Sequence, residues 1–296
     1  MTDDLQLDNI MLDAWADAQE LIASESFLTD NNGFQGIAYQ GDVNFGDGVN
    51  TAVTVGNAGF ANRWVWLNSN SRFQPANAAS LAHPGVVAGT RQGYAKLSVS
   101  NFGSLTYRNT QRKLAAAPPV TNAYYLSGLI RVNALDLKDG EAAAVGFNST
   151  LAQTVALSDG FHFGVSKEGG LTYLSAFAGT QTFPLMELDE PATGRVWQVT
   201  LKLAADARGM DALTAWYAPD DARRLTLAFK DVPVETYSEP ASLRSLRLTT
   251  RAMGRNGTDS DAATLVHVDE IRLGVSLESV TALPDARPPK MIFLLK

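Results

Sequence analysis

GFHFGVSKEGGLTYLSAF, residues 160–177, contains two runs in which aromatic or aliphatic residues alternate with small or polar ones. Alternation of this kind is typical of β-strands, because successive side chains of a strand point to opposite faces of its sheet. KEGG, residues 167–170, separates the two runs and ends in two glycines, which suits the tight turn of an antiparallel hairpin. The stretch therefore predicts a β-hairpin near the middle of the chain.

Short segments with the same alternation recur from Glu25 onward, separated by Gly, Asn and Asp. The clearest are residues 94–100, 124–132, 142–148, 195–203, 212–218, 242–250 and 264–274. Many short strands with little helical periodicity predict an all-β fold, either an antiparallel sandwich or a barrel.

The two ends of the chain depart from this alternation. Residues 8–24, DNIMLDAWADAQELIAS, space their apolar side chains three and four apart, which predicts an amphipathic helix within residues 1–24. This helix packs either on the domain's own surface or on a partner. Five consecutive apolar residues follow a diproline near the other end, so we expect residues 284–296 to form a docking tail. The tail covers either its own sandwich, residues 25–283, or a neighbouring copy, which would make a homo-oligomer.

Composition excludes several classes of function. A formal net charge of −7 and the absence of a basic stripe argue against a nucleic-acid partner, because phosphate contacts need clustered Lys and Arg. The chain has no cysteine, which excludes zinc–thiolate sites, disulfide frameworks and a cysteine nucleophile. There is no apolar run long enough to span a membrane, and the acidic start MTDDLQLD does not have the form of a secretory leader.

Several segments carry a resemblance through their order. ESF (25–27) lies near the start, GRVWQVTLKL (194–203) and DALTAWYAP (211–219) follow in the second half, and VDEIRLG (268–274) closes the series. This order resembles the concanavalin A-like, laminin-G-like jelly-roll domains of bacterial surface and secreted proteins. The resemblance implies a jelly-roll β-sandwich with one concave sheet, ligands bound in the concave groove or at the loop rim, and an extracellular or surface setting. The fold hosts lectins, adhesion domains and polysaccharide-cleaving enzymes, so function must be argued from sites.

Two adjacent carboxylates, Asp269 and Glu270, lie within the closing strand. Strict alternation places Asp269 on the apolar face with Ile271, and Glu270 on the solvated face with Arg272. A carboxylate near the core must accept hydrogen bonds or bind a cation, so amides of a loop and a calcium ion are the alternatives for Asp269. The resemblance implies the second, because related sandwiches hold a structural Ca2+ between the closing strand and an acidic residue of the first strand. Glu25 occupies that first-strand position.

A catalytic pair is suggested by MELDEPATG, residues 186–194. Glu187 and Asp189 match the first two carboxylates of the one-strand arrangement found in jelly-roll glycan hydrolases. The third carboxylate is replaced by Pro191 and Ala192, and the prolines favour a loop here. The three histidines show no metal spacing, so the sequence favours a domain without catalysis.

Tryptophans provide the remaining candidate site, in NRWVWLNSNSRF, residues 62–73. Trp64 and Trp66 share one face if this segment is a strand, with Arg63 and Asn68 beside them. Aromatic faces with polar donors suit a sugar ring, whereas the alternative is that both indoles fill the core. We therefore expect a non-catalytic, glycan-binding recognition domain. An assembly protein of a surface layer, filament or virion is the alternative, and a polysaccharide-cleaving enzyme is a third.

Overall fold

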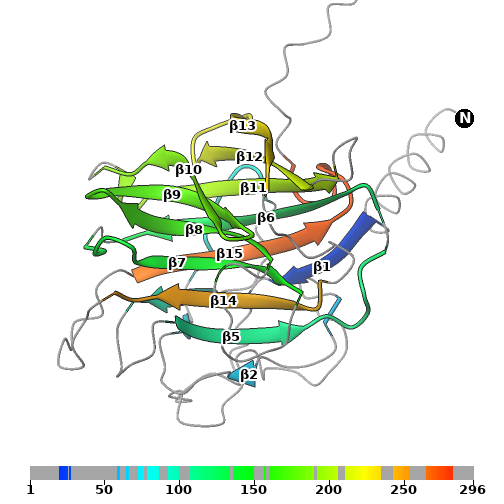
Figure 1. Cartoon of the computed structure of the whole chain (residues 1–296), viewed down its shortest axis with the longest axis horizontal. Coiled ribbons are helices and arrows are strands. Elements are labelled where there is room, and N and C mark those ends of the chain that lie inside the picture. Colours follow the sequence, from blue (N-terminus) through cyan, green and yellow to red (C-terminus); the bar gives the residue numbers. More distant parts are fainter. Residues whose placement is uncertain are drawn as a thin grey trace, which may run out of the picture.

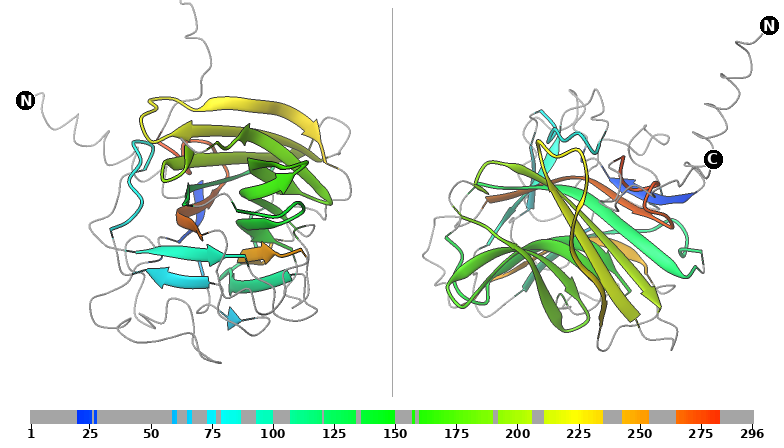
Figure 2. Two further views of the ribbon diagram at one scale, coloured as in Figure 1. Left: turned by 90° about the vertical axis from the view of Figure 1, so that its left-hand side faces the viewer. Right: turned by 90° about the horizontal axis from the view of Figure 1, so that it is seen from above.

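The computed structural model describes residues 20–25, 27, 59–60, 65–66, 73–76, 79–86, 93–99, 107–119, 121–133, 136–149, 157, 160–189, 192–205, 211–234, 243–253 and 265–282. Within these residues, every element with defined bounds is a β-strand, and neighbouring strands pair antiparallel into two sheets (Figure 1). The two sheets lie face to face when the molecule is turned (Figure 2). The predicted antiparallel β-sandwich is therefore confirmed.

The first sheet has eight strands in the order β13–β12–β11–β6–β15–β4–β3, and β1 pairs with β15 off this path. Its strands are β1 (Leu21–Glu25), β3 (Phe73–Ala76), β4 (Tyr94–Ser98), β6 (Ala123–Val132), β11 (Val196–Ala205), β12 (Asp211–Pro219), β13 (Thr226–Pro233) and β15 (Leu265–Gly274).

The second sheet has seven strands in the order β10–β9–β8–β7–β14–β5–β2. They are β2 (Val65–Trp66), β5 (Tyr107–Lys113), β7 (Ala142–Asn148), β8 (Phe161–Glu168), β9 (Leu171–Ala178), β10 (Gln181–Glu187) and β14 (Ser245–Arg251).

The predicted central hairpin is formed by β8 and β9. Their register pairs Phe161 with Ala178 and Glu168 with Leu171, which leaves Gly169 and Gly170 as the turn. Both glycines have positive φ, 59° and 84°, the left-handed conformation that this short turn requires and that side chains disfavour. Asp139 accepts a hydrogen bond from the Gly170 amide at 2.8 Å, which ties the turn to the end of a neighbouring loop.

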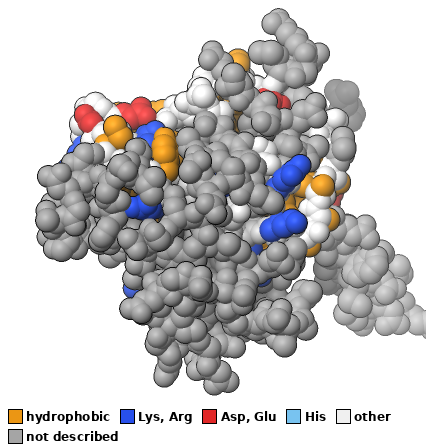
Figure 3. All heavy atoms as spheres, turned by 60° about the horizontal axis from the view of Figure 1, so that its bottom comes forward, with side chains coloured by type: hydrophobic (Ala, Val, Ile, Leu, Met, Phe, Trp, Pro, Cys, Tyr) orange, Lys and Arg blue, Asp and Glu red, His pale blue; other side chains and the backbone are white. Residues whose placement is uncertain are grey.

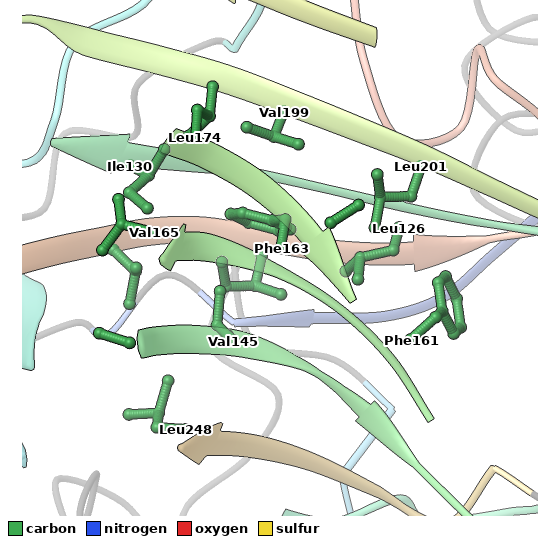
Figure 4. Packing of buried hydrophobic residues seen from close by; sticks show 14 of the residues in the cluster. Leu126, Ile130, Val145, Phe161, Phe163, Val165, Leu174, Val199, Leu201 and Leu248 are labelled. Atoms are coloured by element: carbon green, nitrogen blue, oxygen red, sulfur yellow. The ribbon is translucent and has the colours of Figure 1, made fainter. Parts of the chain in front are cut away.

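The core fills the space between the sheets. Phe161, Phe163 and Val165 of β8 are fully buried and point toward Leu126 and Ile130 of β6 (Figure 4). Gly128 lies among them, and a Cβ at this position would come within 2.7 Å of the Phe163 ring. Alternate residues of each central strand therefore face inward, and the residues between them face the outside of the sandwich.

The sequence-based boundaries need correction at the start of the chain. Leu21 and Ile22 were expected on a helix, but they begin strand β1, which pairs with β15. Pairing with β15 buries Ala23 beside Leu273, so tertiary contacts override the helical spacing here. The rest of the predicted helix, residues 1–19, and the docking tail, residues 284–296, lie outside the described residues.

The prolines predicted a loop over residues 186–194; strand β10 extends to Glu187, and the described residues 188–189 and 192–194 lie outside any strand. Pro184 lies inside β10, which is the outermost strand of its sheet. A proline is tolerated on an edge strand because its missing N–H can face away from the ladder. No helix in the described part of the chain is long and apolar enough to cross a bilayer. On the face shown in Figure 3, the described Lys and Arg side chains lie in small groups among polar and hydrophobic ones.

Replacing Phe163 by alanine tests the inward face of the hairpin. Phe163→Ala removes a fully buried ring from between the sheets and is expected to lower the free energy of unfolding by about 3–5 kcal/mol. Leu171→Ala in the same hairpin is the control, because Leu171 is 44% exposed and its loss should change stability by less than about 0.5 kcal/mol. Urea denaturation of both variants measures the difference, and equal losses would contradict this assignment of faces.

Candidate functional site

The two adjacent carboxylates of β15 lie in a β-bulge. Pairing of β15 with β6 is regular as far as Asp269 and Leu129, and then shifts before Arg272 and Ser127. Glu270 has a φ of 50°, a left-handed conformation that is uncommon for a residue with a side chain. The extra residue reverses the alternation, so that the core side chains are Val266 and Val268 before the bulge and Ile271 and Leu273 after it.

Asp269, the last residue before the bulge, faces outward with His267, on the side of Leu129, where the loop 79–86 covers it. Its Oδ2 accepts a hydrogen bond from the Leu81 amide at 3.0 Å, and its Oδ1 accepts one from the Glu270 amide at 2.9 Å. Burial raises the pKa of Asp269 well above its ordinary value, and the nearby carboxylates of Glu270 and Glu25 raise it further. The structure shows Asp269 hydrogen-bonded to one loop amide, that of Leu81, and to the amide of Glu270 in its own strand.

Glu25 faces the opposite way, into the space between the sheets. Its Oε2 forms a buried ion pair with Arg112 of β5 in the other sheet, and its Oε1 accepts a hydrogen bond from the Phe27 amide at 2.9 Å. The Arg112 guanidinium also lies over the ring of Phe60, 4.6 Å from its centroid. Glu25 therefore links the two sheets.

A calcium ion shared by Glu25 and Asp269 stays a prediction. Each carboxylate is buried, and each already accepts hydrogen bonds from its own set of donors. In the described residues, no group of three or more His, Asp or Glu side chains is placed to hold a metal ion. Measuring the melting temperature at increasing chelator concentrations tests the site directly.

The expectation for Glu270 was partly wrong. Glu270 is buried, not solvated, and it has the left-handed conformation of the bulge. Its carboxylate does lie near an arginine, with Oε2 3.8 Å from Arg272 Nη2. The sequence could not reveal the bulge, since bulges follow from strand pairing and not from local composition.

The tryptophan segment falls mostly outside the described residues, which include neither Arg63, Trp64 nor Asn68. The backbone of Trp66 lies in β2, opposite Thr110 of β5, at the edge of the seven-stranded sheet. The predicted sugar contacts therefore stay a prediction, but the segment's position in the fold is known at this strand.

His83 has a structural role. Its Nε2 lies 3.1 Å from the Ala218 carbonyl oxygen and 3.0 Å from that of Pro219, while its Nδ1 accepts a hydrogen bond from Gly85. These contacts fasten the loop 79–86 to β12, and burial lowers the pKa of His83.

The two candidate catalytic carboxylates, Glu187 and Asp189, lie at the end of β10 and just beyond it. Asp189 lies just beyond the end of β10 and its Oδ1 accepts a hydrogen bond from the Ala192 amide at 3.2 Å, which holds a turn. Glu187 is the last residue of β10 and is exposed.

A row of polar side chains crosses the outer face of the seven-stranded sheet, and sequence reasoning missed it. On β14, Leu246 and Leu248 point into the core, so the residues between and beside them point outward. Register carries this outward face across five neighbouring strands. The buried members of the row are Asn109, Gln111, Ser245, Arg247, Thr249, Asn148, His162, Ser166 and Ser175.

Short hydrogen bonds connect the row across strands. Gln111 Oε1 accepts a hydrogen bond from Arg247 Nη2 at 2.9 Å, and Asn109 Oδ1 accepts one from the Thr249 hydroxyl at 2.7 Å. Beyond β7, the hydroxyls of Ser166 and Ser175 lie 2.8 Å apart. These bonds hold the side chains in fixed positions on a rigid sheet.

His162 and Asn148 form the centre of the row. His162 Nε2 lies 2.8 Å from Asn148 Oδ1, which accepts only, so the ring carries its proton on Nε2 and Nδ1 keeps a lone pair. Burial, and to a lesser extent the Arg247 charge, lower the pKa of His162 to about 3, so the ring is neutral. Gly146 makes room for this ring, because a Cβ there would lie 2.7 Å from His162 Cδ2.

Two atoms of this pair have an unused hydrogen-bonding function. His162 Nδ1 and Asn148 Nδ2 are both buried, and neither has a hydrogen-bond partner in the described structure. A buried polar group without a partner costs about 1–3 kcal/mol, so such atoms mark places where a ligand group or water belongs. One atom is an acceptor and the other is a donor.

Comparison with known proteins gives no family. No family model matches the chain, and no curated protein matches it. Among solved structures, the PL-14 alginate lyase from Aplysia kurodai is similar with a TM-score of 0.42 and 8% identity, over 62% of this chain and 84% of the lyase.

Two further similar structures are a ligand-bound lumenal domain and a glycoside hydrolase. The exoplasmic/lumenal domain of VIP36, bound to Ca2+ and Man3GlcNAc, has a TM-score of 0.40 and 8% identity, over 72% of this chain and 86% of that domain. A GH43 glycoside hydrolase with endo-xylanase and exo-arabinofuranosidase activity has a TM-score of 0.41 and 15% identity, over 74% of this chain but only 39% of the hydrolase. At these similarities, function has to be argued from this chain's own site.

The pH dependence of stability tests the environment of Asp269. A raised pKa in the folded state means that the folded protein holds a proton which the unfolded chain releases near pH 4. The contribution of Asp269 to stability therefore falls as pH rises through the window above pH 4. Asp269→Asn removes this ionisation and loses one of the two accepted hydrogen bonds, at a cost of about 1 kcal/mol. We expect the variant to be less stable than the wild type at pH 4 and the difference to shrink or reverse by pH 8.

Urea denaturation at several pH values measures this difference. Using the difference between the two proteins cancels the titration of all other groups that both share. Parallel curves for wild type and variant would show that Asp269 ionises normally in the folded protein.

Proposed function

We propose that this protein binds a glycan on the outer face of the seven-stranded sheet, without cleaving it. The observation that supports the proposal is the central pair, in which the His162 Nδ1 acceptor and the Asn148 Nδ2 donor are buried and have no partner in the described structure. A sugar hydroxyl is both a donor and an acceptor, so separate hydroxyls of one glycan can satisfy the two atoms.

The rest of the row suits a polyhydroxylated ligand. Amide, hydroxyl, imidazole and guanidinium groups stand on neighbouring strands, which lie about 4.8 Å apart. On the same outward face, Ala142 and Ala144 of β7 pack against Leu157 and Phe177, and the His162 ring fills the space at Gly146. Polar groups fixed by their neighbours also lose little entropy on binding.

The tryptophan segment adjoins this row. Strand β2, which contains Trp66, pairs with β5, and β5 supplies Asn109 and Gln111 to the row. This pairing places the segment at the β2 edge of the same sheet, but it sets Trp66 opposite Thr110 and not opposite a member of the row. The aromatic contacts of Trp64 and Trp66, with Arg63 and Asn68, therefore stay a separate proposal.

The low pKa of His162 supports recognition and not catalysis. A general base is most effective when its pKa lies near the working pH, whereas a ring with a pKa of about 3 has little affinity for a proton. The same neutral ring is a good hydrogen-bond acceptor at every physiological pH. The histidine therefore fits the role of a fixed acceptor for a ligand hydroxyl.

His162→Gln tests the proposal with a small change. The glutamine amide can replace the Nε2–H donor to Asn148 but cannot replace the Nδ1 acceptor, so we expect glycan affinity to fall roughly fivefold, which corresponds to about 1 kcal/mol. Binding is measured on a glycan array and then by calorimetry with the best ligand. His83→Gln is the control, because His83 holds a loop against the other sheet and should affect stability without changing affinity.

Two outcomes would contradict the proposal. Wild-type protein that binds no glycan on the array would remove glycan recognition as its function. Release of new reducing ends from a polysaccharide, abolished in His162→Gln, would show that the row belongs to an enzyme.

A further inference from the structure

A second polar cluster lies on the outer face of the eight-stranded sheet, on the opposite side of the sandwich. Strand register places His267 of β15 directly between Lys96 of β4 and Arg131 of β6. All three face outward, because their neighbours Ala95, Leu97, Ile130, Val132, Val266 and Val268 belong to the core. Three basic residues therefore stand side by side on adjacent strands.

Aromatic stacking and hydrogen bonds fix this cluster. The Tyr94 ring stacks on the His267 ring with centroids 4.3 Å apart, and the Arg131 guanidinium lies 5.5 Å from the centroid of Tyr94. Arg131 Nη2 donates a hydrogen bond to His267 Nδ1 at 2.7 Å, so Nδ1 carries a lone pair and the ring is neutral. Asn133 Nδ2, at the end of β6, lies 3.2 Å from the same Nδ1 acceptor.

The two cations of the cluster lack a counter-charge. In the part of the chain that the structure describes, no carboxylate forms an ion pair with Lys96 or Arg131. Asp269 is the carboxylate that follows on the same face of β15, and it is engaged by the amides of Leu81 and Glu270. Arg131 Nε is buried and has no hydrogen-bond partner in the described structure.

Like charges on adjacent strands cost stability, so their presence needs a reason. The effect is visible in the histidine between them: burial first, and then Arg131 and Lys96, lower the pKa of His267 to about 3. The protein as a whole is acidic, with a net charge of −7, so a local group of uncompensated cations is not a consequence of composition.

We propose that Lys96, Arg131 and Asn133 form a binding site for an oxyanion group, either a carboxylate or a sulfate, carried by a ligand. Lys96 and Arg131 are only half-buried and Asn133 is exposed, so their donors can reach a group in solvent while His267 and Tyr94 form the buried base. Ammonium, guanidinium and amide donors together match the oxygens of such a group. The site lies on the other sheet from the proposed glycan surface and does not depend on it.

The test uses the full chain, inorganic sulfate and sodium acetate, at constant ionic strength set with chloride. The ring signals of the three histidines are followed by NMR after assignment with single variants. We expect a saturable shift of the His267 ring signals with at least one of the two anions. His162 has a similarly low pKa but lies on the other sheet, so its signals should not move.

Two variants separate binding from general charge. Lys96→Gln removes one cation of the cluster and is expected to raise the dissociation constant of the anion about tenfold, while raising the melting temperature in low salt by relieving repulsion. Lys202→Gln is the matched control, because Lys202 also stands half-buried on the outer face of this sheet, on β11 next to Tyr125 and Thr214. It should change neither value.

The sulfate and acetate titrations also distinguish the two kinds of oxyanion. Saturation at lower sulfate than acetate concentration would identify a sulfate site, and the reverse would identify a carboxylate site. Linear shifts with both anions, or the same dissociation constant in Lys96→Gln as in the wild type, would overturn the proposal.

Discussion

The bulge at Asp269 and Glu270 is the constraint on which the rest of the sandwich depends. Before it, β15 pairs with β4 on one side, from Leu265 to Val268; after it, β1 takes that place, from Ile271 to Gly274. The left-handed Glu270 turns the strand by one residue, so that both halves of β15 direct valine, isoleucine or leucine into the core. Without the extra residue, the second half would present Arg272 to the core, because a shift of one residue exchanges the faces of a strand. The strain of a left-handed glutamate, of order 1 kcal/mol, is small beside the burial of two large aliphatic side chains.

The same bulge links the core to the outer faces. Asp269, which faces outward just before the bulge, accepts the hydrogen bond of the Leu81 amide and so fixes the loop 79–86 over Leu129 and Tyr94. On the inner side, strand β1 pairs with the part of β15 that follows the bulge, and Glu25 of β1 forms an ion pair with Arg112 of the other sheet. Two buried carboxylates near one another therefore serve opposite faces, and each is satisfied by different donors. Removing one member of an ion pair such as Glu25–Arg112 leaves the other charge in a largely buried place, which costs more stability than the pair contributes.

Much of the fold followed from the sequence, and less of the candidate site. Alternation located nine strands to within three residues, including the β8–β9 hairpin, because those strands each bury one face and their turns contain glycine. It missed β5, YRNTQRK, since its inward residues Arg108, Thr110 and Arg112 are polar and the period-two signal disappears. The face of Asp269 was predicted wrongly because the bulge depends on long-range pairing. The outward row on β14 was visible as Ser245, Arg247 and Thr249 between leucines, but alternation alone indicates an exposed face. Burial of that row depends on tertiary structure.

The contrast between the two central histidines shows how the same residue acquires different functions on opposite faces. Both rings are neutral because burial and a neighbouring arginine lower the pKa to about 3. In His162, the hydrogen bond to Asn148 uses the Nε2 proton and leaves the Nδ1 acceptor without a partner in the described structure. In His267, Arg131 already occupies Nδ1, and the ring instead serves as a stacked base between two cations. The first arrangement offers an acceptor and an amide donor that point in different directions, which suits the neutral hydroxyls of one ligand. The second offers positive charge with no acceptor of its own to spare, which suits an anion, so the two faces select chemically different groups.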